Sequence, residues 1–165
     1  MDTITSFKPI AERSARILIL GSMPGVASLD AEQYYAHPRN AFWPIMAQLF
    51  SFDLDLPYGD RAVKLKSSQV AVWDVLHSCV RPGSLDSDIE TGTRVPNDFI
   101  RFFEQHPNIE RVGFNGGEAE KSFNRYVLPT IEPEGMSFVR LPSTSPAHTM
   151  SLEKKIAAWK ELLIT

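Results

Sequence analysis

The sequence has few of the residues on which disulfides, metal sites and membrane spans depend. It contains one cysteine, Cys79, which cannot form an internal disulfide, and four histidines without close metal-ligand spacing. Its longest purely aliphatic run, residues 17–20, is far shorter than the ~20 apolar residues of a membrane-spanning helix. The N-terminus shows no apolar signal-peptide region. These absences predict a soluble cytoplasmic protein with no metal and no membrane association.

The sequence also has no excess of positive charge. It carries 17 Lys and Arg against 20 Asp and Glu, a net charge of −3, which excludes a histone-like basic coat. A local basic groove stays possible, because affinity for nucleic acid follows clustered phosphate contacts rather than total charge. The 165 residues correspond to one domain, spanning 1–165, at roughly 100–200 residues per domain.

Four short apolar runs alternate with helical patterns and predict an α/β fold. The runs have strand length, and the first three are almost continuously apolar, as in strands buried on both faces; they are residues 17–20, 70–73, 111–114 and 138–141. Apolar spacing predicts helices over 41–50, 96–105, 117–127 and 151–163. Proline would lie in the first turn of the second helix and Ser151 at the N-cap of the last. Residues 53–59 and 81–94 are predicted to be irregular. This alternation favours a parallel sheet covered on both sides, with ligands beyond the carboxyl ends of its strands.

The ends of the first two strands carry candidate site residues. Gly21-Ser22-Met23-Pro24-Gly25 follows the first strand and forms a tight turn, whose exposed N–H groups suit an anion or a carbonyl oxygen. It can equally be a turn and nothing more. Asp74 ends the apolar run of the second strand. A carboxylate there needs a hydrogen-bonded partner or a raised pKa, so it either ties down a loop or accepts a hydrogen bond from a ligand.

Two later segments carry further candidates. Tyr35 is either a core residue or a stacking surface for a planar ligand, and Asn40, just before a helix, is either an N-cap or a functional amide. Phe42 and Trp43 are expected in the core. The run of hydroxyls and prolines at 142–149 leads into the last helix. It is either a phosphate-binding loop or an ordinary capping loop.

Together, and in this order, these segments resemble the uracil-DNA glycosylase superfamily, most of all its mismatch-specific and hypoxanthine (deoxyinosine) branches. The similar motifs are Gly-x-x-Pro-Gly at 21–25, aromatic-Ala-His-Pro-x-Asn-x-Phe-Trp at 35–43, and a Pro/Ser loop followed by Ser-Leu-Glu-Lys at 141–154. The resemblance implies a three-layer α/β/α fold with a four-stranded parallel sheet. It also implies a monofunctional DNA glycosylase for base excision repair, which hydrolyses the base–sugar bond of hypoxanthine or uracil in DNA without a cofactor. We expect it to act as a monomer.

The resemblance implies a role for each matching residue. Asn40 inherits the catalytic position, where it would hold the attacking water, and Tyr35 matches the aromatic residue that stacks on the extruded base. Asp74 stands where many relatives use Asn to read a pyrimidine edge. The base pocket would also include Gly21, Ser22 and Met23, and the DNA-binding loop would consist of Ser143, Thr144, Ser145, Pro146, Ala147 and His148. Further phosphate contacts are expected from Arg39, Arg81, Lys154 and Lys155, although each can also belong to a solvated face.

Two positions depart from the family pattern and keep other functions open. Met23 replaces a polar residue that often positions water, and Ala147 replaces a large apolar wedge. Both departures favour a non-catalytic DNA-damage or nucleotide-binding module on the same fold. An enzyme for free nucleosides is a second alternative. A third is an α/β hydrolase with Ser22 or Ser143 as nucleophile and His148 as base, although the G-x-S-x-G elbow of such enzymes is missing.

Overall fold

A four-stranded parallel sheet forms the centre of the molecule. The computed structural model describes residues 2–164. The sheet has the strand order β3-β2-β6-β7, with β2 at Ile17–Gly21, β3 at Val70–Asp74, β6 at Arg111–Asn115 and β7 at Ser137–Leu141. All three neighbouring pairs are parallel. Each strand contains one of the four predicted apolar runs, so the prediction of the sheet is confirmed.

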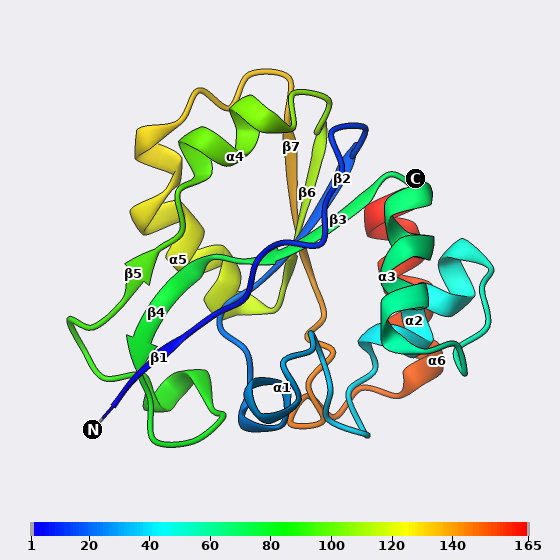
Figure 1. The fold of residues 1–165 in the computed structure, drawn as a ribbon, viewed down its shortest axis with the longest axis horizontal. Helices are drawn as coiled ribbons and strands as arrows, with labels where there is room; N and C mark the ends of the chain where they lie inside the picture. The colour runs from blue at the N-terminus through cyan, green and yellow to red at the C-terminus, as the bar shows by residue number, and fades with distance from the viewer. Residues whose placement is uncertain (1, 165) are drawn as a thin grey trace.

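Helices cover both faces of this sheet and give the three-layer α/β/α arrangement that the sequence predicts. In Figure 1 α4 and α5 lie on one side of the sheet, and α2, α3 and α6 lie on the other. The helices are α1 at Val26–Ala31, α2 at Phe42–Phe50, α3 at Tyr58–Ser67, α4 at Phe99–Gln105, α5 at Gly117–Tyr126 and α6 at Leu152–Trp159. Within residues 2–164, none of them is long and apolar enough to span a membrane.

The apolar faces that predicted the helices form the core. Phe42 and Trp43 are buried on α2, and Trp159 on α6 is fully buried against Phe42. On the other side Phe99 and Phe102 of α4 pack against Trp73 of β3. As predicted, Ser151 caps α6, and its hydroxyl accepts a hydrogen bond from the Lys154 amide.

The sequence prediction was wrong for the start of α4 and missed several short elements. Pro96 lies in β5, Val95–Pro96, and not in the first turn of a helix; α4 begins at Phe99, where the Asp98 side chain accepts from the Arg101 amide. β5 belongs to a small antiparallel sheet with β1 at Thr3–Thr5 and β4 at Leu76–Val80, in the order β1-β4-β5. Neither this sheet nor α1 and α3 was predicted. Single helical turns occur at Asp86–Asp88, Leu128–Thr130 and Lys160–Ile164.

The carboxyl ends of the four parallel strands meet at one edge of the central sheet. Gly21 and Asp74 are paired at the ends of β2 and β3, and Asn115 and Leu141 at the ends of β6 and β7. The chain then continues into loops on the side of the molecule where α1 lies, at the bottom of Figure 1. This edge therefore brings together segments that are more than a hundred residues apart in the sequence.

Candidate active site

A cavity of about 400 Å³ opens at this edge of the sheet. Every parallel strand contributes to its wall, through Gly21, Asp74 and Asn115 at strand ends and Ser143 just beyond β7. The structure brings together all the site residues named from the sequence; the lining includes Gly21, Ser22, Met23, Tyr35, Asn40, Asp74, Ser143, Thr144, Ser145, Pro146, Ala147 and His148. Sequence reasoning missed further lining residues, among them Asn115 and Asp86.

Asp74 contributes a carboxyl group that forms no ion pair within residues 2–164. Its side chain is buried, and among residues 2–164 no partner lies within hydrogen-bonding distance of Oδ2. Burial, reinforced by the negative charge of Asp86 and opposed by Arg81, raises the pKa of Asp74 from 3.8 to about 7. The Asn97 amide binds only the backbone carbonyl of Asp74. This arrangement favours the second of the two predicted roles of Asp74, in which its carboxyl group accepts a hydrogen bond from a ligand.

Tyr35 lies above the end of β2 in a conformation that is rare for a bulky residue. Its φ is 55°, in the left-handed region. Phe42 stacks on its ring at a centroid distance of 4.1 Å, so a ligand base can stack only on the opposite ring face. The hydroxyl group is buried and has no hydrogen-bond partner among the described residues. Tyr35 is thus packed on one side and has an unsatisfied polar end on the cavity side.

Asn40 already has a structural contact as well as a place in the cavity wall. Its Oδ1 accepts a hydrogen bond from the Phe42 amide at 2.9 Å. The N-cap position of α2 is Ala41, so Asn40 does not occupy the cap position itself but satisfies an amide of the first turn from one residue earlier. A carbonyl oxygen has a second lone pair, and Asn40 therefore can hold the helix start and also bind a molecule in the cavity.

The loop after β7 is fixed to the end of β6 through Thr144. The Asn115 Nδ2 donates to the Thr144 hydroxyl and the Thr144 amide donates to Asn115 Oδ1, both at 2.9 Å. The Thr144 carbonyl accepts from the Ala41 amide at 2.9 Å. Thr144 is 1% exposed, whereas Ser145 is partly exposed and the following residues 146–148 are exposed. Thr144 therefore holds this loop in place, and residues 146–148 of the same loop are exposed to solvent.

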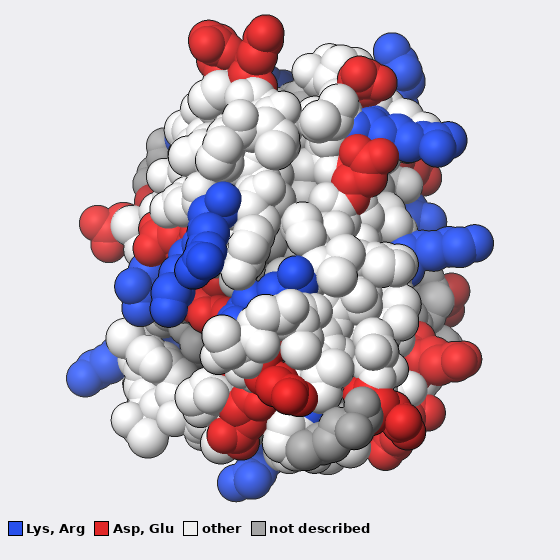
Figure 2. Space-filling view, turned by 90° about the vertical axis from the view of Figure 1, so that its left-hand side faces the viewer, with Lys and Arg blue, Asp and Glu red and all other residues white. Residues whose placement is uncertain are grey.

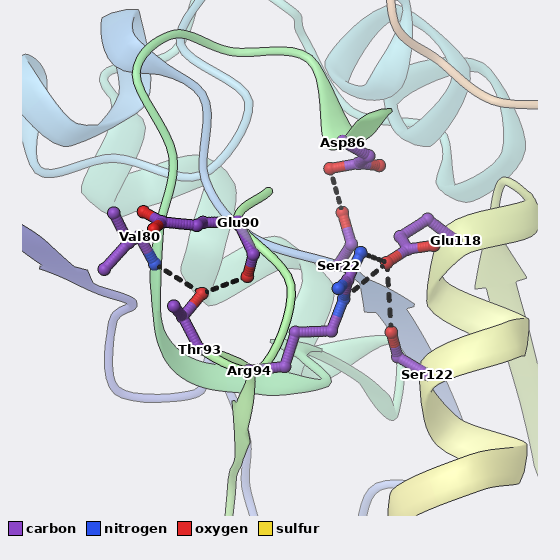
Figure 3. A network of polar contacts seen from close by, with 8 residues as sticks. All are labelled: Ser22, Val80, Asp86, Glu90, Thr93, Arg94, Glu118 and Ser122. Carbon is purple, nitrogen blue, oxygen red and sulfur yellow. Dashed lines mark hydrogen bonds and ion pairs between the residues drawn. The ribbon is translucent and has the colours of Figure 1, made fainter. Parts of the chain in front are cut away.

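Residues 84–86 of the irregular segment 81–94 form another part of the cavity wall. Polar contacts hold this segment at several points (Figure 3). The Ser22 hydroxyl donates to Asp86 Oδ1 at 2.8 Å. Arg94 forms a part-buried ion pair with Glu118 at 2.8 Å, and the Thr93 hydroxyl connects the Val80 amide with the Glu90 carbonyl. The segment was correctly predicted to be irregular. These polar contacts nevertheless hold its backbone in one position beside the cavity.

Two of the four cations expected to bind phosphate are buried instead. Arg81 is 5% exposed and donates to the carbonyls of Pro24 and Gly83, so it joins the two loops on either side of the cavity. Lys155 is 3% exposed, and its Nζ donates to the Ser145 carbonyl at 3.2 Å. Their burial and their contacts with backbone carbonyls favour a role in holding the loops together over the predicted contact with phosphate. Arg39 and Lys154 are exposed.

The face that carries β5, α4 and α5 shows no continuous basic surface (Figure 2). Basic and acidic side chains are interspersed there, with uncharged surface between them. Clustered positive charge attracts a DNA duplex, so this face provides little electrostatic attraction for DNA. Within residues 2–164, no group of three or more His, Cys, Asp or Glu side chains could hold a metal ion.

Nearly the whole chain is similar to proteins of one known family. A sequence model of the uracil DNA glycosylase superfamily matches residues 7–163. A hypoxanthine DNA glycosylase of Methanosarcina barkeri is 33% identical over 156 residues, 94% of each chain. A protein of the same description from Methanosarcina acetivorans is 31% identical over 155 residues, 93% of this chain and 94% of its own. A solution NMR structure of a candidate uracil DNA glycosylase from M. acetivorans superposes with a TM-score of 0.79 at 28% identity, covering 97% of this chain and 98% of that one.

Proposed function

The chain belongs to the uracil DNA glycosylase superfamily, and we propose that it hydrolyses the N-glycosidic bond of a deaminated base, hypoxanthine or uracil, in DNA. The observation that carries the proposal is the cavity at the carboxyl edge of the sheet, in which an amide, a carboxyl group and a phenol from three different segments meet. Hypoxanthine DNA glycosylases similar over nearly the whole chain support the same substrate class.

The reaction requires the target nucleotide to leave the duplex. Extrusion costs a few kcal/mol and costs least for a mispaired or damaged base. The extruded base would enter the cavity beside Tyr35, and the Asp74 carboxylate would accept the N1–H of hypoxanthine or the N3–H of uracil. The DNA backbone would run over the loop after β7, where Ser143, Ser145 and residues 146–148 line the cavity mouth.

Bond cleavage passes through an oxocarbenium-like sugar and leaves negative charge on the departing base. Among the described residues, no acceptor takes the amide hydrogens of Ser22 or Met23, and both residues line the cavity. These amides would stabilise the charge on the base. Asn40 would position the attacking water through the free lone pair of Oδ1, because a strongly electrophilic sugar cation needs an oriented nucleophile more than a strong base.

The test is base release from duplexes that carry uracil, hypoxanthine, xanthine or thymine opposite each normal base, followed by alkali cleavage. We expect the wild type to leave alkali-labile sites at hypoxanthine or uracil. Asn40→Ala should lower the single-turnover rate by about 100-fold or more. Asn40→Asp is the matched variant, because its carboxylate keeps an acceptor for the Phe42 amide. Because the carboxylate also keeps an acceptor for the water, Asn40→Asp should retain base release. A slow Asn40→Ala that stays folded under the assay conditions would separate the catalytic role from the structural one.

Two results would contradict the proposal. Wild-type activity in Asn40→Ala would remove Asn40 from the mechanism. Retention of lesion duplex by the wild type without any base release would instead support a non-catalytic DNA-damage-binding module, the alternative that Met23 and Ala147 favour.

The proposal extends to the chain as a whole. Residues 1–165 would form one glycosylase domain that acts as a monomer on DNA in the cytoplasm, with Arg39 and Lys154 among its phosphate contacts. The family match over residues 7–163 supports a single domain. Sedimentation equilibrium with and without a lesion duplex tests the monomer, and a dimer mass in either sample would contradict it.

A further inference from the structure

Two unsatisfied polar groups converge on the floor of the cavity. The Tyr35 hydroxyl and the Asp74 Oδ2 are both buried and lack a hydrogen-bond partner among residues 2–164. A Cβ atom placed on Gly21 would lie 2.5 Å from Asp74 Oδ1 and 2.8 Å from the Tyr35 hydroxyl. The absence of a side chain on Gly21 therefore allows both groups to approach its backbone, and all three residues line the cavity. Buried polar atoms without partners are rare in proteins, and two in the wall of one cavity indicate a ligand that supplies the missing hydrogen bonds.

The surrounding chain fixes the position of the Tyr35 hydroxyl. The Tyr34 amide donates to the Tyr58 hydroxyl at 3.1 Å, and the Tyr34 hydroxyl donates to the Lys8 carbonyl at 2.8 Å. The Ala36 amide donates to the Ser28 hydroxyl at 3.0 Å. The residues on both sides of Tyr35 are thus anchored while Tyr35 itself has a φ of 55°. Strain at a bulky residue persists only where the surroundings impose it, and here they aim the phenol at Gly21.

The phenol is a hydrogen-bond donor under all physiological conditions. Burial and the nearby Asp74 carboxyl raise the pKa of Tyr35 well above its ordinary value. The Asn115 side chain opposes this rise. Its Oδ1 and one Nδ2 hydrogen bind Thr144, and its second Nδ2 hydrogen can only be donated to the phenol oxygen, so the phenol O–H stays available as a donor. The cavity floor therefore offers an O–H donor beside a carboxyl acceptor.

We propose that Tyr35 is a specificity-determining residue whose hydroxyl donates a hydrogen bond to the oxo oxygen of the extruded base, while Asp74 accepts from the adjacent ring N–H. This inference rests on the proposed function and adds a substrate class to it, namely bases with a lactam edge. A lactam presents a donor next to an acceptor, which matches the acceptor and donor of this pair. Deamination creates that edge, because it replaces an amino group by an oxo group and places a hydrogen on the neighbouring ring nitrogen.

Tyr35 and Asp74 together discriminate against bases with an amino group at this edge. Lactam bases of normal DNA are discriminated against by the cost of their extrusion instead. Above pH 7, where Asp74 is ionised, adenine and cytosine would direct a ring-nitrogen lone pair at its carboxylate, which is unfavourable in a buried site. Guanine and thymine carry the lactam edge as well, and their stable pairing in the duplex makes extrusion more costly. The hydroxyl group of Tyr35 thus recognises the edge of the base. The ring of Tyr35, which stacks on Phe42, could not do this by itself.

Tyr35→Phe is the decisive variant, because it keeps the ring and removes only the hydroxyl. We expect single-turnover release of hypoxanthine to fall by about 10- to 100-fold, since a hydrogen bond to a base that gains charge is lost. Tyr126→Phe, a tyrosine outside the cavity lining, is the matched control and should retain wild-type activity. Binding is measured separately with non-cleavable duplexes whose 2′-fluorinated sugar carries either hypoxanthine or unsubstituted purine, which lacks both the oxo group and the N1–H.

The readouts separate the possible failures. A loss for Tyr35→Phe on the hypoxanthine duplex, with unchanged binding of the purine duplex, supports the inference. Wild-type behaviour of Tyr35→Phe would overturn it, as would an equal loss on both duplexes, which indicates a structural hydroxyl. The wild type should bind hypoxanthine at least about tenfold more tightly than purine, and equal binding would overturn the inference even if the variant folds poorly. Absence of any base release by the wild type would refute the proposed function instead.

Discussion

Replacing Asp74 by asparagine should stabilise the folded protein at alkaline pH but not at acidic pH. Burial raises the pKa of this carboxyl group from 3.8 to about 7. Between these two values the native state holds a proton that the unfolded chain has lost. Stability therefore falls as the pH rises through this window. Once the pH exceeds both values, the wild type carries a penalty of about 4 kcal/mol from this single group.

The asparagine variant removes this penalty but keeps a buried polar group. An unsatisfied amide costs about 1–3 kcal/mol, so at pH 4 the variant should be equal to the wild type or less stable. From pH 4 to pH 8.5 its stability relative to the wild type should increase by about 4 kcal/mol.

Urea unfolding followed by tryptophan fluorescence at a series of pH values measures this difference. The buried Trp43, Trp73 and Trp159 report on loss of the core. Asp88→Asn, which removes an exposed carboxyl group from the same wall, controls for the loss of one charge and should stay within about 0.5 kcal/mol of the wild type. A difference between wild type and Asp74→Asn that does not change with pH would refute the argument, because it would mean that Asp74 ionises in its ordinary range.

Three further substitutions test the walls of the cavity. Gly21→Ala should weaken binding of a non-cleavable hypoxanthine duplex at least about tenfold and cost about 1–3 kcal/mol in urea unfolding, because its Cβ would lie 2.5 Å from Asp74 Oδ1; unchanged binding would contradict the proposed cavity floor. Asn115→Ala removes both hydrogen bonds to Thr144 and should lower the free energy of unfolding by about 1–3 kcal/mol, together with DNA affinity. Arg81→Met should destabilise the fold yet leave the salt dependence of DNA binding unchanged, whereas Arg39→Ala should reduce its slope by about 1; a reduced slope for Arg81→Met would show a phosphate contact after all.

The central sheet was predictable because three of its four strands, β2, β3 and β6, are buried on both faces. Val70–Asp74 is buried at every position, and such a strand reads as a continuous apolar run. The small antiparallel sheet gave no such signal. β1 has three residues and β5 has two, and pairs this short are decided by tertiary packing rather than by pattern. Pro96 was misassigned for a related reason, since a proline suits an edge strand as well as a first helical turn.

The site was predictable where a residue type was unusual for its position. Asp74 stood out because a carboxylate ended an apolar run. Asn115 did not, because an asparagine before two glycines is an ordinary end for a strand. The sequence also gave no means to see that Arg81 and Lys155 are buried, since long basic side chains are normally exposed. Only the fold shows that the carbonyls of Pro24 and Ser145 bind them.

Strain and unsatisfied polar groups are concentrated around the cavity, and this concentration is the strongest physical sign of function. Four buried side-chain polar atoms in residues 2–164 lack a partner; two belong to Tyr35 and Asp74, and a third to Arg81, which holds the cavity walls together. Of the four non-glycine residues with positive φ, three lie at or just after helix ends, where a left-handed residue is common. Tyr35 is the exception. A sequence selected for stability alone would remove these costs, whereas a site that must bind one base edge keeps its hydrogen-bonding groups unsatisfied until that base arrives.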